Sequence, residues 1–361
     1  MSLDMPLAPS GTMARFGEIL ACAALALGLG ACGAPAGEAL DLGRAEQPII
    51  GGALDEATSG VVGLALDLGT RVAGHCSGTL IAPNLVLTAR HCVAFTEDTD
   101  EAGVVACDTA TFDTSFPARL LLASPNPIRP TDPADPSYVR GREIRTLGAE
   151  DKVCGSDIAL IILEEPIPAA VEPIAPRIEL SPVDREPFST VGYGLTSLDD
   201  PSSDGTRQRA DGSAVRCSGE ECVALSNGSI QSSEWASVDA PICSGDSGGP
   251  ALDGQGRVIG VASRGDPNCE IAVYGDVSSW GPFIVDTALA AAVIGDYPPP
   301  VWTDRVPIDL QTRVAVSGDR GGCSLAAPAP SRAPGAGLGL LVVVSAGWTV
   351  RRLRSRFRPR L

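Results

Sequence analysis

The sequence predicts an all-β domain, because its composition favours turns and its apolar residues fall in short runs. It contains 41 Gly and 30 Pro, which is typical of a chain with many loops. From Ile49 to Gly295, short apolar runs are broken by Gly, Pro, Asp and Ser. Many short strands in one stretch favour a barrel or a sandwich. The runs predicted as strands are residues 61–66, 79–82, 85–87, 158–163, 189–193 and 258–262.

One segment is predicted as a helix and two as long loops. Residues 284–294 are the one good helical stretch, and they lie at the end of the predicted domain. Residues 125–150 and 197–216 are rich in Pro, Asp, Ser and Gly, so we predict both as surface loops. Aromatic residues make up only 4% of the chain, and the core must therefore be built mainly from aliphatic side chains.

The charge of the chain excludes nucleic acid as a partner. The net charge is −17, although six Arg lie within the last eleven residues. Without that cluster the remainder carries a charge of −23. A surface this acidic repels a phosphate backbone.

The N-terminal segment is predicted to export the protein. Residues 19–31 form an uncharged apolar run of signal-peptide length, and Arg15 precedes it. We therefore predict a signal peptide over residues 1–32 and a propeptide over residues 33–48. Leu29-Gly30-Ala31-Cys32 resembles a bacterial lipobox, in which Cys32 would be lipidated; an ordinary small-residue cleavage site fits nearly as well.

The C-terminal segment is predicted to hold the protein at a membrane. A Pro-rich linker over residues 296–332 leads to 18 uncharged residues, 333–350, which suffice to span a bilayer. The Arg-rich tail, residues 351–361, would remain cytoplasmic. Cys323, the apolar run and the Arg cluster together resemble the myxobacterial Cys-containing type of sorting signal. That resemblance implies a sorting protease acting near Cys323 and lipid at Cys32 or Cys323, whereas a plain tail anchor has the same topology. The predicted location is the cell surface, the outer membrane or the extracellular space.

Cysteine usage indicates disulfides rather than a metal site. Of eleven Cys, two lie in the N-terminal segment and one in the tail, which leaves an even number in the domain. Even numbers of Cys in an exported domain favour disulfide pairing. His75 and His91 are the two histidines, and paired short Cys-x-x-Cys spacings are lacking, so we expect no metal. We also expect no organic cofactor.

Four motifs carry the chemistry. They are Ile49-Ile50-Gly51-Gly52, Thr88-Ala89-Arg90-His91-Cys92, Asp157-Ile158-Ala159-Leu160 and Gly245-Asp246-Ser247-Gly248-Gly249-Pro250. Together and in this order they resemble the trypsin/chymotrypsin-like serine protease family, over about two-thirds of the chain, here taken as residues 49–295. The resemblance implies two antiparallel six-stranded β-barrels with a C-terminal helix.

The resemblance also implies the catalytic roles. Ser247 would be the nucleophile, His91 its general base, and Asp157 the group that orients and stabilises the imidazolium. The backbone N–H groups of Gly245 and Ser247 would form the oxyanion hole. In the family, a freed N-terminal ammonium, here of Ile49, pairs with the Asp before the nucleophile, here Asp246.

Further residues are assigned by the same resemblance. Expected disulfides are Cys76–Cys92 and Cys243–Cys269, and we also expect Cys107–Cys154 and Cys217–Cys222, although sequence alone does not fix connectivity. His75 would flank the cleft in a structural or substrate-lining role. The predicted substrate-binding residues are Pro241, Ile242, Ser263, Gly265 and Ala272.

Two departures from the family pattern affect specificity and activation. Pro241 stands where trypsin-like members carry an Asp, which argues against cleavage after Arg or Lys. A fairly small apolar P1 residue is expected, with Ala272 narrowing the pocket, unless Asp266 or Glu270 supplies a charge from the side. Pro48 stands where a basic residue usually precedes the mature N-terminus, so cleavage at Arg44 with trimming is one route to activation.

The predicted function is therefore that of a serine endopeptidase. It would act on protein or peptide substrates through an acyl-enzyme and would be made as a zymogen, secreted and held at the cell surface. Two other hypotheses are a non-catalytic surface binding module on a protease fold, and an anchored zymogen that Pro48 keeps unprocessed.

Overall fold

The computed structural model describes residue 49 and residues 52–305, except for 98–104, 148–150, 198, 201, 239 and 267. The predicted signal peptide, propeptide, membrane segment and Arg-rich tail lie outside the described residues, as does the linker beyond residue 305. The elements below all belong to one compact unit.

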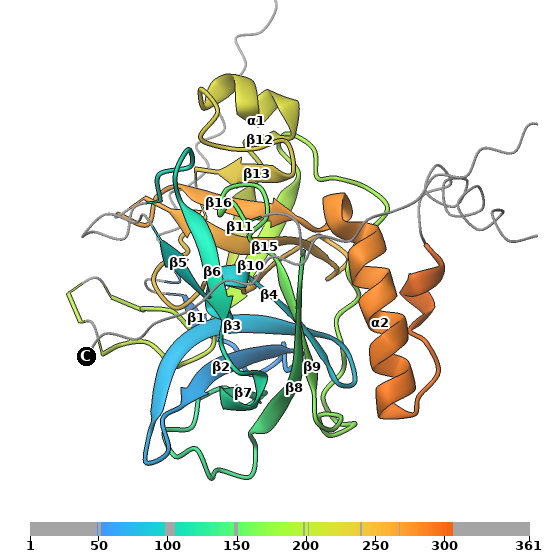
Figure 1. The fold of residues 1–361 in the computed structure, drawn as a ribbon. Coiled ribbons are helices and arrows are strands. Elements are labelled where there is room, and N and C mark those ends of the chain that lie inside the picture. Colours follow the sequence, from blue (N-terminus) through green and yellow to red (C-terminus); the bar gives the residue numbers. More distant parts are fainter. Residues whose placement is uncertain are drawn as a thin grey trace, which may run out of the picture. The chain divides into compact units, whose positions relative to one another are not determined.

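The first half of the unit is a closed barrel of six antiparallel strands (Figure 1). Aliphatic side chains of β2, β4 and β9 fill its centre, and every residue of β9 is buried. A strand in which apolar and polar residues do not alternate is expected where both of its faces pack against other elements. In barrel order the strands are β2 (Val61–Asp67), β3 (Val72–Ala82), β4 (Leu85–Thr88), β9 (Ala159–Leu163), β8 (Val139–Thr146) and β7 (Leu121–Ser124).

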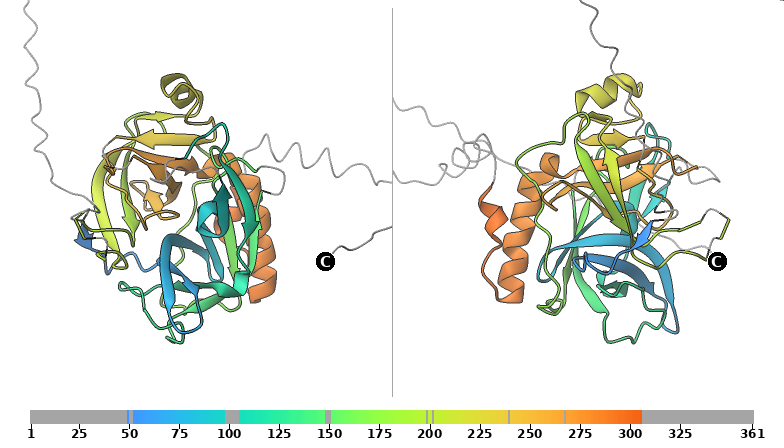
Figure 2. Two further views of the ribbon diagram at one scale, coloured as in Figure 1. Left: turned by 60° about the vertical axis from the view of Figure 1, so that its left-hand side comes forward. Right: turned by 180° about the vertical axis from the view of Figure 1, so that it is seen from behind.

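The second half is an eight-stranded antiparallel sheet that curls into a half-barrel (Figure 2). Its two end strands, β1 and β12, have two residues each and pair with an inner neighbour only, so this sheet is open among the described residues. The all-β class is confirmed, although the expected second six-stranded barrel is an open sheet in this structure. In sheet order the strands are β1 (Ala53–Leu54), β11 (Gln208–Ala214), β10 (Pro187–Gly192), β14 (Pro250–Leu252), β15 (Val258–Gly265), β16 (Ala272–Asp276), β13 (Glu234–Ser237) and β12 (Cys217–Ser218).

Helices and one hairpin complete the unit. The hairpin pairs β5 (Ala94–Glu97) with β6 (Thr111–Ser115) directly after the His91 turn. The α-helices are α1 (Glu220–Leu225) and α2 (Gly281–Gly295). The 3-10 turns are Arg90–Cys92, Ala118–Leu120, Val277–Trp280 and Val301–Asp304.

Helix α2 confirms the predicted C-terminal helix and packs on the first barrel. The side chains of Ile284, Ala288 and Ala291 are buried in the cluster that contains the barrel's core residues. Figure 2 shows the helix lying along the barrel. Among the described residues, Val277–Gly295 is the one helical stretch long and apolar enough to cross a membrane. Its burial is that of a core helix, so its composition is weak evidence for a membrane span.

Both predicted loops contain a strand, which corrects the prediction from composition. Residues 125–150 include β8, and residues 197–216 include β11. These strands read Val-Arg-Gly-Arg-Glu-Ile-Arg-Thr and Gln-Arg-Ala-Asp-Gly-Ser-Ala, and much of each is half-buried or exposed. A strand with one solvated face can be as polar as a loop. The six strands predicted from apolar runs are confirmed as β2, β3, β4, β9, β10 and β15, and β3 begins earlier, at Val72.

An aromatic cluster forms the centre of the second core. The rings of Trp235 and Tyr274 stack with centroids 4.3 Å apart, and Phe188 meets both edge-on. The Trp235 Nε1–H donates to the Ile259 carbonyl at 3.3 Å, which satisfies its polar atom in a site without solvent. A Cβ at Gly260 would overlap the indole, so this glycine makes room for the ring. Three aromatic side chains thus form the centre of the core beneath the strands that carry the second half of the site.

Replacing Trp235 by Ala should destabilise the domain by about 3–5 kcal/mol, because it removes a buried indole and leaves a cavity. Urea denaturation of the variant measures this change. The matched control is Val293→Ala on α2, where the side chain is 83% exposed and the change should stay within about 0.5 kcal/mol. An unchanged unfolding midpoint for Trp235→Ala would contradict the packing described here.

Candidate active site

A cleft with a volume of about 640 Å³ opens between the closed barrel and the second sheet. The predicted residues His91, Asp157 and Ser247 all line it. His91 lies in the turn after β4 and Asp157 just before β9, so both come from the first barrel, whereas Ser247 precedes β14 of the second sheet. The other residues that line the cleft are Thr96, Val105, Cys107, Val153, Ser229, Ile230, Ser263, Arg264, Gly265, Asp266, Ile271 and Val273.

The His91 turn is fixed by its neighbours in sequence. Strand β4 ends at Thr88, whose hydroxyl donates to the Ser77 carbonyl at 2.8 Å. One 3-10 turn, Arg90–Cys92, then reverses the chain, and Cys92 is buried and bonded to Cys76 of β3. The turn thus leaves His91 at the cleft while the residues on either side of it are buried.

His91 and Asp157 form a hydrogen-bonded pair. The Nδ1 atom of His91 lies 2.7 Å from Oδ2 of Asp157, and the His91 backbone N–H donates to Oδ1 at 2.9 Å. The Ser263 hydroxyl donates to the same Oδ2 at 2.6 Å. Asp157 is almost fully buried, so a carboxylate here depends on these donors.

The Asp157 carboxylate and the His91 imidazolium stabilise each other. Burial disfavours the Asp157 carboxylate, but His91 and the hydrogen bonds outweigh it and lower the pKa of Asp157. Burial likewise disfavours the imidazolium, but Asp157 outweighs it and raises the pKa of His91, while the Arg264 cation acts in the opposite direction. Imidazolium and carboxylate are therefore mutually stabilised.

The Ser247 loop requires glycine at two positions. Gly245 and Gly248 have φ angles of +96° and +80°, in the left-handed region that favours glycine. A Cβ at Gly245 would also lie 2.8 Å from the Gly194 Cα, and one at Gly248 would overlap the Thr88 hydroxyl. The loop is bonded to the first barrel, because the Ser77 N–H donates to the Ser247 carbonyl at 2.8 Å.

Asp246 is a buried carboxylate with backbone partners. Its Oδ1 accepts from the Gly194 N–H at 2.8 Å and its Oδ2 from the Cys243 N–H at 2.9 Å. Burial raises the pKa of Asp246 to about 7, although the two backbone donors oppose this shift. No basic side chain of the described residues forms an ion pair with it. Ile49 is fully buried in the second core, in the same cluster as Ile242.

Four disulfides join the cysteines of the described residues, with the expected pairings. They join Cys76 to Cys92, Cys107 to Cys154, Cys217 to Cys222, and Cys243 to Cys269, with Cα–Cα distances of 6.0, 5.4, 5.1 and 5.2 Å. The second of these ties the segment after β5 to the segment before Asp157, and Cys107 and Val153 there line the cleft.

The predicted substrate pocket is only partly reproduced. Ser263 and Gly265 line the cleft, but Pro241, Ile242 and Ala272 do not. Ile242 and Ala272 are buried in the second core. In place of Ala272, its neighbours Ile271 and Val273 face the cleft, because successive side chains of a strand point to opposite faces. The side chain of His75 lies outside the described part of the structure.

Asp266 and Glu270, the two acids considered as sources of negative charge for the substrate pocket, differ in their position relative to the cleft. Asp266 lines the cleft, but its carboxylate accepts the backbone N–H groups of Asn268, Glu270 and Ile271, and these donors outweigh burial and lower the pKa of Asp266. Glu270 is exposed and does not line the cleft.

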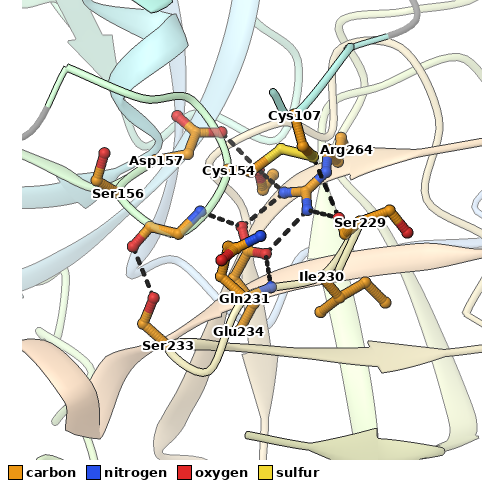
Figure 3. A network of polar contacts seen from close by, with 12 residues as sticks. Cys107, Cys154, Ser156, Asp157, Ser229, Ile230, Gln231, Ser233, Glu234 and Arg264 are labelled. Atoms are coloured by element: carbon orange, nitrogen blue, oxygen red, sulfur yellow. Dashed lines mark hydrogen bonds and ion pairs between the residues drawn. A yellow bond between two sulfur atoms is a disulfide. The ribbon is translucent and has the colours of Figure 1, made fainter. Parts of the chain in front are cut away.

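Sequence reasoning missed an ion pair at the cleft wall. Arg264 lines the cleft and binds Glu234 of β13 through both guanidinium NH groups, at 2.6 and 2.8 Å (Figure 3). The only local signal was a charged residue at the end of an apolar strand run. Its partner lies thirty residues away in the chain and is brought to it by strand pairing.

Comparison with known proteins gives the family. A model of the trypsin family matches residues 49–284, which is more than half of the chain. No curated protein sequence matches significantly. Among solved structures, the chain is similar to neuropsin, a serine protease expressed in the limbic system of mouse brain, at 18% identity and a TM-score of 0.47, over 65% of this chain and 96% of that one. On the match of the family model, this chain belongs to the trypsin family.

Proposed function

We propose that the protein is a serine endopeptidase in which Ser247, His91 and Asp157 act together. The observation that carries the proposal is the hydrogen-bonded His91–Asp157 pair, which lines one cleft with Ser247. A serine hydroxyl becomes a strong nucleophile only when a base can take its proton, and a neutral imidazole oriented by a carboxylate is such a base.

The proposed reaction has two halves. Ser247 Oγ attacks the substrate carbonyl carbon while His91 takes the hydroxyl proton, and Asp157 stabilises the imidazolium. His91 then gives this proton to the leaving amine, which departs as the C–N bond breaks and leaves an acyl-enzyme. In the second half, water attacks the carbonyl carbon of the acyl-enzyme while His91 takes its proton. His91 then returns this proton to Ser247 Oγ as the ester bond breaks, and the carboxylic acid product leaves. The backbone N–H groups of Gly245 and Ser247 would bind the oxyanion in both halves. Because His91 must be neutral to act, activity should fall as the pH drops through its raised pKa.

Activation is proposed to involve Ile49 and Asp246. A buried carboxylate with a raised pKa is costly to ionise without a cation. A freed Ile49 ammonium would supply one, and the Ile49 side chain already packs in the second core. Because Pro48 precedes Ile49, a zymogen would need cleavage at that bond or trimming from Arg44.

Export and anchoring complete the proposal. Four disulfides suit an oxidising compartment. The apolar run at residues 19–31 would direct export, and the run at residues 333–350 would hold the protein at the cell surface. Lipid at Cys32 or Cys323, and a sorting protease acting near Cys323, remain part of this proposal.

The proposed P1 preference is a fairly small apolar residue. Ile271, Val273 and Ile230 give the cleft apolar walls. The one described carboxylate of the side loop that faces it, Asp266, is already bonded to three backbone N–H groups. An unpaired substrate cation would lose several kcal/mol on burial, whereas an apolar side chain gains roughly 25 cal/mol per Å².

Ser247→Ala and His91→Ala should each lower kcat by at least about 10⁴-fold with little change in folding, because the triad acts as a unit. Hydrolysis of a peptide substrate and labelling by an organophosphonate measure this loss. The control is Ser202→Ala at an exposed serine, which should retain full activity. Labelling that survives in Ser247→Ala would identify a different nucleophile.

The active protein should begin at Ile49, and Asp246→Asn should lower its kcat by about 10²-fold or more, because the proposed ion pair shapes the oxyanion hole. N-terminal sequencing of the active species and steady-state kinetics test these two points. An active chain whose first residue lies before Ile49 would rule out this activation mechanism.

Cleavage should be strongest after Ala, Val or Leu and weaker after Phe or Trp, since Ile271 and Val273 limit the space at the wall. A scan of a peptide library with the activated enzyme gives the preference. Dominant cleavage after Arg or Lys would contradict it and point to Asp266 as the charge that binds the substrate.

A further inference from the structure

One wall of the cleft carries an arginine, Arg264, whose charge is paired with a buried carboxylate behind it. Arg264, at the end of β15, is bonded to the carboxylate of Glu234 in a bidentate ion pair, with N–O distances of 2.6 and 2.8 Å. The Glu234 side chain is 2% exposed and that of Arg264 13% exposed. Buried charges are tolerated only when they are paired and fully hydrogen-bonded, so such a pair is a specific feature of this wall.

Glu234 also holds the segment that leads to Asp157. Its Oε1 accepts the Gly155 N–H at 2.8 Å, two residues before Asp157, and its Oε2 accepts the Gln231 N–H at 2.9 Å. The Ser233 hydroxyl donates to the Gly155 carbonyl at 2.7 Å (Figure 3). Both backbone groups of Gly155 are therefore bonded to residues 233 and 234 of the second sheet.

Arg264 connects the pair to the other side of Asp157. Its Nη1 lies 3.4 Å from the hydroxyl of Ser263, which donates to Asp157 Oδ2 at 2.6 Å. Its Nη2 donates to the Ser229 carbonyl at 2.8 Å. One ion pair thus touches the backbone before Asp157 and the hydroxyl that binds its carboxylate.

We propose that Arg264 and Glu234 are positioning residues, which hold Asp157 against His91 and whose opposite charges set the pH at which His91 loses its proton. This proposal deepens the proposed function and rests on it. Glu234 acts on the position of Asp157 through Gly155, and Arg264 acts through Ser263. Neither needs to touch a substrate.

The electrostatic part depends on the groups around His91. Asp157 faces it from the segment before β9, Arg264 from β15, and Arg90 lies beside it in its own turn with Asp157 and Asp151 as its acidic neighbours. Asp266 lies farther along the cleft wall. Of these, Arg264 opposes the protonation of His91, which agrees with the geometry of the pair. Removing the cation should favour the imidazolium, and removing the Glu234 anion should disfavour it.

The test is a titration of His91 by NMR in the Ser247→Ala protein, labelled at histidine. The chain has only two histidines, so the signal that disappears in His91→Gln is assigned to His91. We expect Arg264→Gln to raise the pKa of His91, Glu234→Gln to lower it, and Arg264→Lys to keep it near the parent value. Opposite shifts from the two partners cannot arise from a general loosening of the fold.

Kinetics in the Ser247 protein provide the second readout. The acidic limb of the pH profile of kcat/KM should move to higher pH in Arg264→Gln and to lower pH in Glu234→Gln. Relative to its own plateau, kcat/KM at pH 6 should therefore fall in Arg264→Gln and rise in Glu234→Gln, each by roughly two- to fivefold. Glu234→Gln should also lower the plateau kcat by about tenfold to a hundredfold with little change in KM, because Asp157 is then less well held.

The matched control is the pair of Arg177 and Glu186, which is equally bidentate but does not line the cleft. Glu186→Gln should lower the thermal midpoint without moving the His91 titration. If the Arg264 and Glu234 variants behave in the same way, the pair is structural and the proposal is wrong. It is also wrong if Arg264→Gln changes only KM for substrates with acidic side chains.

Two further comparisons distinguish a failure of this proposal from a variant that does not fold and from a failure of the proposed function. If Glu234→Gln does not fold, the comparison of Arg264→Gln with Arg264→Lys decides alone, and equal titrations in these two overturn the proposal. If the parent, processed so that it begins at Ile49, hydrolyses no peptide, the proposed function fails, but the NMR titration still tests the effect of the pair on His91.

Discussion

The burial of the Asp157 carboxylate at the junction of the two sheets is the constraint on which the site depends. A carboxylate out of contact with water must be surrounded by donors, and here they come from both halves of the unit: His91 from the barrel and Ser263 from the second sheet. Each donor is fixed by its own strand or turn. The two halves therefore cannot separate or slide without leaving a buried charge unpaired, which is far more costly than losing an exposed contact.

Ser77 shows how the same junction holds the serine loop. This fully buried residue of β3 donates its N–H to the Ser247 carbonyl and its hydroxyl to the Gly245 carbonyl, while its hydroxyl accepts the Tyr193 N–H. Its own carbonyl accepts the Thr88 hydroxyl, three residues before His91. Through its backbone and its hydroxyl, this one small residue links the strand that leads to His91, the Ser247 loop and the residue that follows β10. An apolar residue here would leave two polar groups, the Gly245 carbonyl and the Tyr193 N–H, without the hydroxyl that they bind.

The sequence predicted the parts of the fold and site that are encoded locally. Short aliphatic runs revealed six strands, and contiguous motifs located His91, Asp157 and the Ser247 loop, whose glycines do adopt left-handed angles. Polar strands such as β8 and β11 could not be told from loops, since periodicity fails where one face is solvated. The residues of the substrate pocket were harder to predict than the strands. The sequence does not show that Ala272 points into the core while its neighbours Ile271 and Val273 point into the cleft. Arg264 and Glu234 meet only through the pairing of β15, β16 and β13.

The three buried carboxylates of this region are satisfied in different ways, and the difference bears on what the molecule needs in order to act. Asp157 faces a histidine and Glu234 an arginine, so each has a partner that can carry positive charge within the described chain. Among the described residues, Asp246 accepts from two backbone N–H groups, and burial raises its pKa to about 7 against the effect of these donors. Gly192 and Gly194 leave no room for a side chain beside this carboxylate, since a Cβ on either would overlap it. Neither position 192 nor position 194 can therefore supply a basic side chain to this carboxylate. This need for a cation is the reason that the proposed activation assigns the free N-terminus of Ile49 to Asp246.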